Sequence, residues 1–482
     1  MSGTGPDAGR TGEGPVPGAA GVAAEASEVS VVVPYYRAQT DLDRLVAALA
    51  AQDHPASRLQ LVVADDGSPE PPVLPADLPF DAVVVRHEDR GFRAAAARAL
   101  GVRAAEGRVL AFLDGDMLPE PGYLSAACAA PAASGDAVVV GRRRHLRPER
   151  VAAGWRPGEP VPEADLLEEP AWLREAYAAS GDLAVTDATS YRFVISAVLT
   201  VAREVYEDAG GFDPAFVGYG GEDWELAHRL WRVGGTFRHE PAAVAWQAGE
   251  DFGGREDPAA ARAVKQREAL VLASRITAPT ARGHSLALVG PQRAAVRVRA
   301  EGAPEEGREA AAVVGVDAAL QAFPGARVTV TGLASDAARA ALADPRVTVV
   351  EGDGAGDDVL PDPPARGDLA GVRAVPDWDV DVRVPLRPAG RGERPDPTRA
   401  ADWLLRIERA GVKRVEVLGA PDDGAGDDGA RPVLATLTSS RARWRGRRGG
   451  GPGRVWRVPA SRLGWAPVPA DVDLEAWWGG WA

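Results

Sequence analysis

The stretch VLAFLDGDM, residues 109–117, ends a run of apolar residues with two carboxylates, Asp114 and Asp116, separated only by Gly115. Residues two apart on an extended strand point to the same side, so both acids would face one way. Two like charges held this close repel each other unless a positive charge lies beside them. The pair therefore indicates either a divalent-cation site or a solvated turn, and composition alone favours the turn because Asp and Gly are common turn residues. The segments around it decide between the two.

The chain has 482 residues, and 45% of them are hydrophobic and 26% charged, which is ordinary for a soluble globular protein. This length exceeds what one hydrophobic core usually organises, so we expect two domains. The net charge of −14 argues against general nucleic-acid binding, which needs a basic face. The single cysteine, Cys128, excludes an intramolecular disulfide and fits a reducing cytoplasm.

The beginning of the chain differs in composition from the rest. Residues 1–28 are rich in Gly, Ala and Pro and lack both a basic start and an apolar segment, so we expect a disordered tail and no signal peptide. No stretch of 18 or more apolar residues follows, so we expect no transmembrane segment and a cytoplasmic protein.

From residue 29 onward, apolar β-branched runs alternate with segments of helical periodicity. This alternation predicts an α/β fold with a mainly parallel sheet and helices on both faces. In such sheets, ligands bind beyond the carboxyl ends of the strands. The expected strand ends carry polar residues: Tyr35 and Tyr36, Asp65 and Asp66, and Asp114 and Asp116. Turn chemistry alone does not account for polar groups at three such ends, so we expect a ligand site at this edge.

A second acidic pair, Glu222 and Asp223, follows two glycines and precedes the helical pattern WELAHRLWRVG. The amino end of a helix stabilises a carboxylate, so we expect Asp223 to be ionised there. The alternative is that Asp223 is a plain N-cap residue.

The remainder of the chain has an α/β rhythm of its own. We expect residues 278–287 to be a linker and residues 288–482 to form a second, smaller α/β domain. The basic run at 441–454 predicts a solvated surface. The acidic cluster DWDVD at 377–381 does not follow an apolar strand and is therefore a poor candidate for a metal site.

Five segments resemble, in order and spacing, the signature stretches of family 2 glycosyltransferases with the GT-A fold. They are VSVVVPYYR (29–37), VVADDGS (62–68), GFRAAAARALG (91–101), VLAFLDGDM (109–117) and GGFDPAFVGYGGEDWEL (210–226). The resemblance implies a GT-A nucleotide-diphospho-sugar transferase fold over residues 29–277. The part from 288 to 482 resembles, much more weakly, a degenerate second GT-A-like unit without an evident pair of metal-binding acids, and we expect its role to be structural.

The resemblance also implies roles for residues at the donor end. Tyr36 matches the position that stacks on the nucleobase, with Pro34 beside it, and Asp66 matches the acid that reads the edge of the base. Asp114 matches the acid near the ribose. Asp116 matches the acid that binds a divalent metal, Mn²⁺ or Mg²⁺, which prefers oxygen ligands such as carboxylates and phosphates.

Asp223 matches the family's catalytic base, and Glu222 matches its neighbour in the acceptor pocket. Arg98 lies within the third of these segments, GFRAAAARALG (91–101), and we assign it to the donor site. Many relatives place a metal-binding histidine beyond the acidic pair, where this chain has Gln247. His239 is close by in the sequence, and we expect it to be a surface histidine.

The expected activity is that of an inverting glycosyltransferase that moves a sugar from a nucleotide-diphosphate sugar to an acceptor hydroxyl. The acceptor could be a polysaccharide, a lipid-linked intermediate or a small molecule, and a lipid-linked acceptor would be met at the inner membrane face. Two alternatives stay open: a nucleotide-sugar-binding scaffold whose metal site has decayed, suggested by Gln247, and a nucleotidyltransferase. A glycosidase is disfavoured because paired acids at a strand end indicate a phosphate-bound metal.

Overall fold

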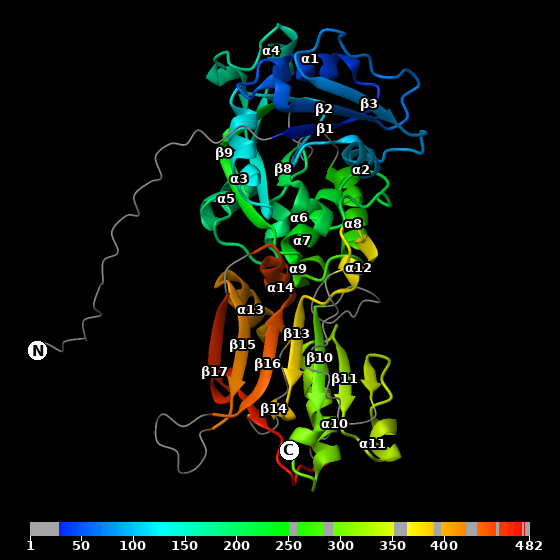
Figure 1. Ribbon diagram of the computed structural model, residues 1–482, viewed down its shortest axis with the longest axis vertical. Helices are drawn as coiled ribbons and strands as arrows, with labels where there is room; N and C mark the ends of the chain where they lie inside the picture. The colour runs from blue at the N-terminus through cyan, green and yellow to red at the C-terminus, as the bar shows by residue number, and fades with distance from the viewer. Residues whose placement is uncertain are drawn as a thin grey trace, which may run out of the picture.

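The computed structural model describes residues 28–249, 258–282, 293–350, 364–389, 397–420, 431–449, 453–474 and 477. The chain forms two parts, stacked along the long axis (Figure 1), and each is built around its own sheet. The expected tail at 1–28 falls, apart from Glu28, outside the described residues.

The first sheet has strand order β3-β2-β1-β4-β8-β6-β9-β5, with the short β7 beside β6. Strands β1 to β4 run parallel, β8 is antiparallel to both β4 and β6, and β9 is again parallel to β6. The strands are β1 (Val29–Tyr35), β2 (Leu59–Asp65), β3 (Asp81–Arg86), β4 (Val109–Leu113), β5 (Met117–Pro119), β6 (Ala137–Leu146), β7 (Leu166–Leu167), β8 (Val198–Ala202) and β9 (Thr236–Ala248). This sheet confirms the predicted parallel-rich α/β class.

The helices of this part cover the sheet through small and aliphatic side chains. In α1, Leu42, Leu45 and Leu49 are buried at helical spacing. Helix α2 lies close to β1 because it carries Gly101, where a Cβ would come within 2.6 Å of Val32 Cγ1. The helices are α1 (Gln39–Ala50), α2 (Ala94–Ala104), α3 (Tyr123–Ala133), α4 (Pro148–Ala152), α5 (Ala171–Ser180), α6 (Arg203–Asp208), α7 (Glu222–Arg232), α8 (Pro258–Ala273) and α9 (Pro279–Arg282).

The second sheet has strand order β12-β11-β10-β13-β16-β15-β17, and a separate ribbon pairs β14 with β18. Its core consists mainly of valine, leucine and alanine side chains from the sheet and from α10 and α13. Its strands are β10 (Ala294–Arg299), β11 (Arg327–Thr331), β12 (Val347–Val349), β13 (Trp378–Val382), β14 (Leu386–Pro388), β15 (Val412–Leu418), β16 (Val433–Ser439), β17 (Arg454–Pro459) and β18 (Trp465–Pro467), and its helices are α10 (Arg308–Ala322), α11 (Asp336–Ala341), α12 (Leu369–Ala374), α13 (Pro397–Arg409) and α14 (Ser440–Arg447). The expected second, smaller α/β unit is confirmed.

One expectation about this second part is wrong. The start of the basic run at 441–454 is no solvated surface, because α14 packs at the junction of the two parts and Trp444 joins the core of the first part (Figure 1). The cluster at 377–381 belongs to a strand itself, since Trp378–Val382 form the central strand β13, and Asp377 is buried beside it. Arg232 and Arg293 neutralise Asp377, so it serves as an ion-pair residue.

The expected linker at 278–287 begins in packed structure. Ala278 is buried in the core of the first part, and residues 279–282 form α9. Residues 283–287 lie outside the described part of the chain. None of the described helices is long and apolar enough to cross a membrane.

Candidate functional site

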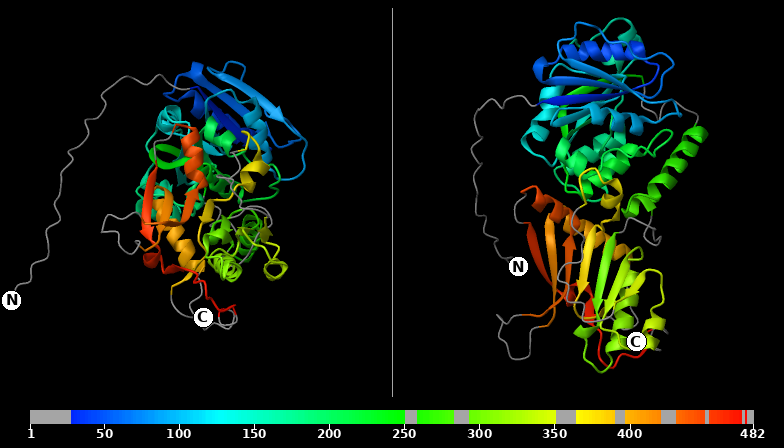
Figure 2. Two further views of the ribbon diagram at one scale, coloured as in Figure 1. Left: turned by 60° about the horizontal axis from the view of Figure 1, so that its bottom comes forward. Right: turned by 45° about the vertical axis from the view of Figure 1, so that its right-hand side comes forward.

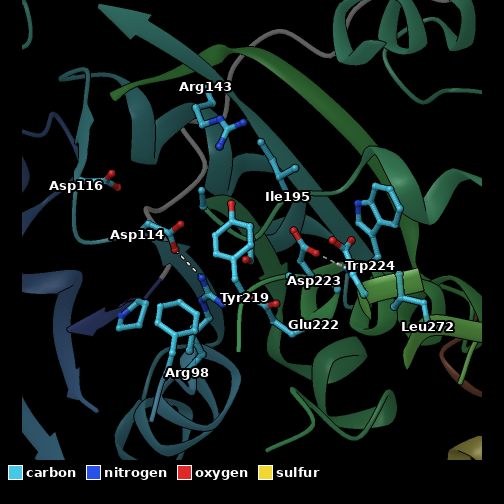
Figure 3. A pocket seen from close by; sticks show the side chains of 18 of the residues that line it. Arg98, Asp114, Asp116, Arg143, Ile195, Tyr219, Glu222, Asp223, Trp224 and Leu272 are labelled. Carbon is cyan, nitrogen blue, oxygen red and sulfur yellow. Dashed lines mark hydrogen bonds and ion pairs between the residues drawn. The ribbon is translucent and has the colours of Figure 1, made fainter. Parts of the chain in front are cut away.

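A cleft of about 780 Å³ opens at the carboxyl edge of the first sheet, beyond β1, β2 and β4. All eight residues assigned to the site from the sequence line this cleft: Pro34, Tyr36, Asp66, Arg98, Asp114, Asp116, Glu222 and Asp223. Figure 3 shows the last five of them. The fold thus brings together residues that lie almost 190 positions apart in the chain.

At one end of the cleft, two side chains extend beyond β1 and β2. Tyr36 is 41% exposed, and its hydroxyl donates a hydrogen bond of 3.2 Å to Asp89. Asp66 is buried, and its carboxylate lies 2.5 Å from His87 Nε2 and accepts a hydrogen bond of 2.7 Å from the Arg93 amide. An exposed ring beside a held carboxylate is suited to a flat, polar-edged group such as a nucleobase.

Arg98 supplies a positive charge beside one of the paired acids, Asp114. Its guanidinium donates to Asp114 Oδ1 at 2.6 Å and to Glu222 Oε1 at 3.1 Å, and the residue is only 3% exposed. Burial alone would lower the pKa of Arg98, but the two carboxylates raise it above its usual value, so the side chain stays charged. One cation from α2 therefore joins the acid at the end of β4 to the acid at the start of α7 (Figure 3).

Asp116 has a different partner. Its Oδ2 accepts a hydrogen bond of 2.7 Å from Gln247 Nε2, since Gln247 lies on β9 opposite Met117 of β5. The other amide atom, Gln247 Oε1, is buried without a hydrogen-bond partner. Gln247 thus lies beside Asp116, where the family resemblance expects a histidine.

The residues around Asp116 fit a metal that is held largely by its substrate. Among the described residues, no three His, Cys, Asp or Glu side chains gather as a complete metal cage. Mg²⁺ and similar ions are commonly held by one or two carboxylates together with substrate phosphates. Asp116 supplies one such carboxylate, and the unsatisfied Gln247 Oε1 is a second hard oxygen close by.

His239 is not the expected surface histidine. It is buried on β9, where its Nδ1 lies 2.7 Å from Asp182 Oδ1 and its ring stacks on Tyr177 at a centroid distance of 3.8 Å. It does not line the cleft. The sequence around His239 did not indicate that Tyr177 of α5 would pack on its ring.

The second acidic pair begins α7. The N-cap is Gly221, with φ of 91°, so Asp223 is the second helical residue and the plain N-cap alternative is wrong. Asp223 Oδ1 accepts a hydrogen bond of 2.7 Å from the Trp224 amide. Nevertheless, burial and the neighbouring charge of Glu222 raise the pKa of Asp223 to about 7, so the expectation of a fully ionised carboxylate is also wrong. In this position, burial and charge repulsion outweigh the helix terminus.

Sequence reasoning missed the contribution of α8 to the cleft. Glu268 is buried there and is paired with Lys265 at 2.8 Å. The glycines before α7 accommodate it, because a Cβ on Gly220 would come within 2.8 Å of Glu268 Oε2. The glycine pair in the sequence was a signal of this close approach, although it did not identify the partner.

An aromatic wall, also missed, stands on the α7 side of the cleft. Trp224 lies edge-to-face with Trp172 and Tyr191, at centroid distances of 6.4 and 5.9 Å. Trp172 is 45% exposed, although large apolar side chains are usually buried. Trp172 lines the same cleft as Asp223, so an exposed aromatic ring is available there.

The comparisons with known proteins agree with this geometry. Residues 30–194 match the family model described as glycosyl transferase family 2. This segment of the chain is therefore similar to a family 2 glycosyltransferase domain. Residues 186–245 also match a model described as the N-terminal domain of galactosyltransferase, and this segment includes Glu222 and Asp223.

Validoxylamine A glucosyltransferase from Streptomyces hygroscopicus subsp. limoneus is 32% identical over 237 residues, which are 45% of this chain and 50% of that protein. Hyaluronan synthase from Pasteurella multocida is 27% identical over 238 residues, or 24% of its length. The chain thus spans half the length of the first relative. Among solved structures, the mannosyltransferase PcManGT from Pyrobaculum calidifontis in complex with GDP-Man and Mn²⁺ matches 52% of this chain and 63% of its own, with 20% identity and a TM-score of 0.35.

Proposed function

We propose that this protein is an inverting glycosyltransferase that transfers a sugar from a nucleotide-diphosphate sugar to an acceptor hydroxyl. One observation carries the proposal: the acids at the end of β4 and the acids at the start of α7 share one cleft and are joined by Arg98. A family 2 domain over residues 30–194 supports the same activity.

In this proposal, the β1–β2 end of the cleft binds the donor. The Tyr36 ring stacks on the nucleobase beside Pro34, and Asp66 accepts hydrogen bonds from the edge of the base. Each carboxylate oxygen of Asp66 keeps a lone pair beyond its bonds to His87 and Arg93. Asp114, held by Arg98, faces the ribose.

Asp116 would hold a divalent cation, Mn²⁺ or Mg²⁺, together with the diphosphate of the donor. When bound, such an ion neutralises negative charge that develops on the leaving diphosphate. The contribution of this chain is the carboxylate of Asp116, oriented by the Gln247 amide.

Asp223 acts in the proposal as the general base. A base is most effective when its pKa lies near the working pH, and the pKa of Asp223 is about 7. It would take the proton of the acceptor hydroxyl as that oxygen attacks the anomeric carbon and the diphosphate leaves from the opposite face. Direct displacement of this kind inverts the anomeric centre.

The acceptor side is lined by Trp172 and Trp224. These rings suit the apolar face of a sugar or cyclitol, so a carbohydrate or small-molecule acceptor fits better than one recognised by charge alone. A lipid-linked acceptor remains part of the proposal and would be met at the inner face of the membrane by a cytoplasmic enzyme. No nucleic-acid partner is proposed, because the chain carries a net charge of −14.

One observation favours a second candidate, a nucleotide-sugar-binding scaffold: Gln247 takes the position of a metal ligand. The two candidates differ in whether nucleotide is released from a bound donor. We expect UDP-glucose, UDP-GlcNAc or GDP-mannose to raise the melting temperature more strongly with Mn²⁺ than without it, by mass action on the native state.

The ligand that gives the largest shift is then incubated with validoxylamine A and simple sugars as acceptors, and released nucleotide is measured. Release that depends on the acceptor supports the transferase. Binding without release under every acceptor supports the scaffold, and the absence of any thermal shift would contradict both candidates.

A further inference from the structure

The two sheets of this chain share one topology. The order β12-β11-β10-β13-β16-β15-β17 repeats β3-β2-β1-β4-β8-β6-β9, with the strands met in the same sequence along the chain. The directions also repeat: β10 is parallel to β11 and β13, β16 is antiparallel to β13 and β15, and β17 is parallel to β15. Such agreement across seven strands indicates two copies of one fold.

The small ribbons extend this agreement to single residues. Strand β5 begins at Met117, four residues after β4 ends, and β14 begins at Leu386, four residues after β13 ends. Met117 pairs with Gln247 of β9, and Leu386 pairs with Pro467 of β18. The ribbon β14–β18 is therefore the counterpart of β5–β9.

This correspondence shows what the second copy has in place of the site. Counting from the paired strand ends, Asp114 corresponds to Arg383 and Asp116 to Pro385, while Gln247 corresponds to Pro467. Between β16 and β17, α14 is the one helix among the described residues, and it follows β16 as α6 follows β8. The second copy thus has no described counterpart of α7, Glu222 and Asp223.

The edge that forms the cleft in the first copy is partly covered in the second, where Pro385 is buried and Arg383 is exposed. The Val468 amide donates to the Pro385 carbonyl at 2.9 Å, and Trp477 Nε1 donates to Asp317 at 2.7 Å. A Cβ on Gly307 would collide with the Ala470 carbonyl, so the segment after β18 lies directly on the start of α10. With arginine and proline in place of the two acids, the second copy lacks the carboxylates that the donor chemistry proposed for the first copy requires.

The second copy instead contacts the first copy at α7. Arg373 of α12 donates to Glu225 Oε1 at 2.7 Å and to Asp213 Oδ2 at 2.8 Å. Glu225 lies in the same first turn of α7 as Glu222 and Asp223, and it is 1% exposed. An ion pair from the second copy therefore fixes the turn that carries the proposed base.

The other end of α7 is held as well. Arg232, its last residue, forms a buried ion pair with Asp377 and also donates to the Val375 carbonyl. Arg441 of α14 donates to the carbonyl of Trp231. Figures 1 and 2 show α12 and α14 at the junction of the two parts, with α10 and α11 at the far end of the second sheet.

We propose that the C-terminal unit is a second, non-catalytic copy of the fold, and that it positions α7, with Glu222 and Asp223, through Arg373 and Asp377. This inference rests on the proposed function for the role of Asp223. Arg373 and Asp377 are positioning residues, since neither lines the cleft. Small displacements of reacting groups are costly in enzymes, about a hundredfold in rate for 1 Å.

The experiment compares Arg373→Ala with Arg366→Ala in the full chain. Arg366 also joins the two parts, but its partners Glu204 and Asp208 belong to α6 and not to α7. We expect Arg373→Ala to lower kcat for donor hydrolysis or transfer by about 10–100-fold with little change in KM. Backbone hydrogen exchange should rise in the first turn of α7 and stay unchanged in β1, β2 and β4. Arg366→Ala should show neither effect on α7.

Arg373→Lys tests the same contact without removing the charge, and we expect it to restore part of the lost kcat. Unchanged kcat and unchanged exchange in α7 for Arg373→Ala would overturn the inference. Equal effects of Arg366→Ala on kcat and on exchange in α7 would also overturn it, because they would indicate a general loss of stability. Exchange in α7 is readable even without a known substrate. If the wild type neither binds nor cleaves any nucleotide sugar while Arg373→Ala still loosens α7, the proposed function fails and the positioning stands.

Discussion

Gln247 Nε2 donates a hydrogen bond of 2.7 Å to Asp116 Oδ2 across the β5–β9 ribbon. This amide occupies the position at which the family resemblance expects a histidine. An amide that donates to the acid holds its orientation, but it competes with a metal for the same carboxylate oxygen. The strength of metal binding therefore depends on this pair.

The first prediction concerns these two residues. We expect Asp116→Asn to remove the Mn²⁺-dependent part of UDP binding, because it removes the carboxylate that is proposed to hold the metal. Gln247→His should strengthen that part by about tenfold, since an imidazole nitrogen is a better ligand than an amide and second-sphere changes alter metal affinity by about 10–100-fold. Calorimetry with UDP, with and without Mn²⁺, measures both effects. Asp81→Asn on the exposed β3 is the control. Unchanged metal dependence in Asp116→Asn would rule out this residue as the ligand.

The second prediction concerns Arg98, the buried cation between Asp114 and Glu222. Arg98→Met keeps the length of the side chain but leaves two carboxylates without their shared partner. We expect the free energy of unfolding to fall by about 3 kcal/mol, the lower end for breaking a buried pair, because both acids also face the cleft. Urea denaturation measures this change.

Arg98 also lowers the pKa of Asp223 through its charge. The pH dependence of the rate in Arg98→Met should therefore move to higher pH. Arg98→Lys should keep more of the stability than Arg98→Met. One ammonium group, however, does not reproduce the simultaneous ion pairs of the guanidinium with Asp114 and Glu222. A Met variant as stable as the wild type would show that the acids find other partners.

Local patterns were sufficient to predict the parallel-rich sheet, and the family resemblance supplied the eight lining residues. Apolar runs such as VLAFL specify buried strands, and the acids that end them lie at the carboxyl edge by geometry. The pKa of Asp223 could not be predicted, since it depends on burial by elements distant in sequence and on the charge of Glu268 in α8. The repeated topology was only weakly visible for the same reason: strand order is set by pairings between distant segments.

The third prediction concerns a chain that ends near residue 280, within the linker expected at 278–287. That chain would lack Arg373 and Asp377, and it would lose Val372 and Trp444 from the core of the first part. We expect it to be insoluble or much less stable, because uncompensated buried charges typically cost about 3–5 kcal/mol each. A chain that starts at residue 28 keeps all the contacts described above and should melt like the full chain. A well-folded chain ending at 280 that binds UDP would contradict this expectation.

The last prediction concerns Asp223, whose pKa is raised to about 7 by burial and by Glu222. The proposed base works only when ionised, so the rate should rise with pH through about 7 and then level off. Asp223→Asn keeps the shape of the side chain without the base. Transfer should therefore fall by about 10²–10⁴-fold and lose this pH step. Donor binding, measured by calorimetry at pH 7, should stay close to that of the wild type.

The same pKa predicts how stability changes with pH. The folded state binds the proton of Asp223 more tightly than the unfolded state, in which the carboxyl has an ordinary pKa near 3.8. This contribution to stability is complete below about pH 4 and is lost as the pH rises through 7, because an ionised carboxylate then lies half-buried beside the charge of Glu222. Asn never ionises, so Asp223→Asn should gain melting temperature relative to the wild type between pH 5 and pH 8.

Glu225→Gln is the contrasting variant, since Arg229 and Arg373 hold the pKa of Glu225 at about 2 despite its burial. That variant should be destabilised by a similar amount at both pH values. A constant difference between wild type and Asp223→Asn, together with transfer within a few-fold of the wild type, would remove Asp223 from the proposed mechanism.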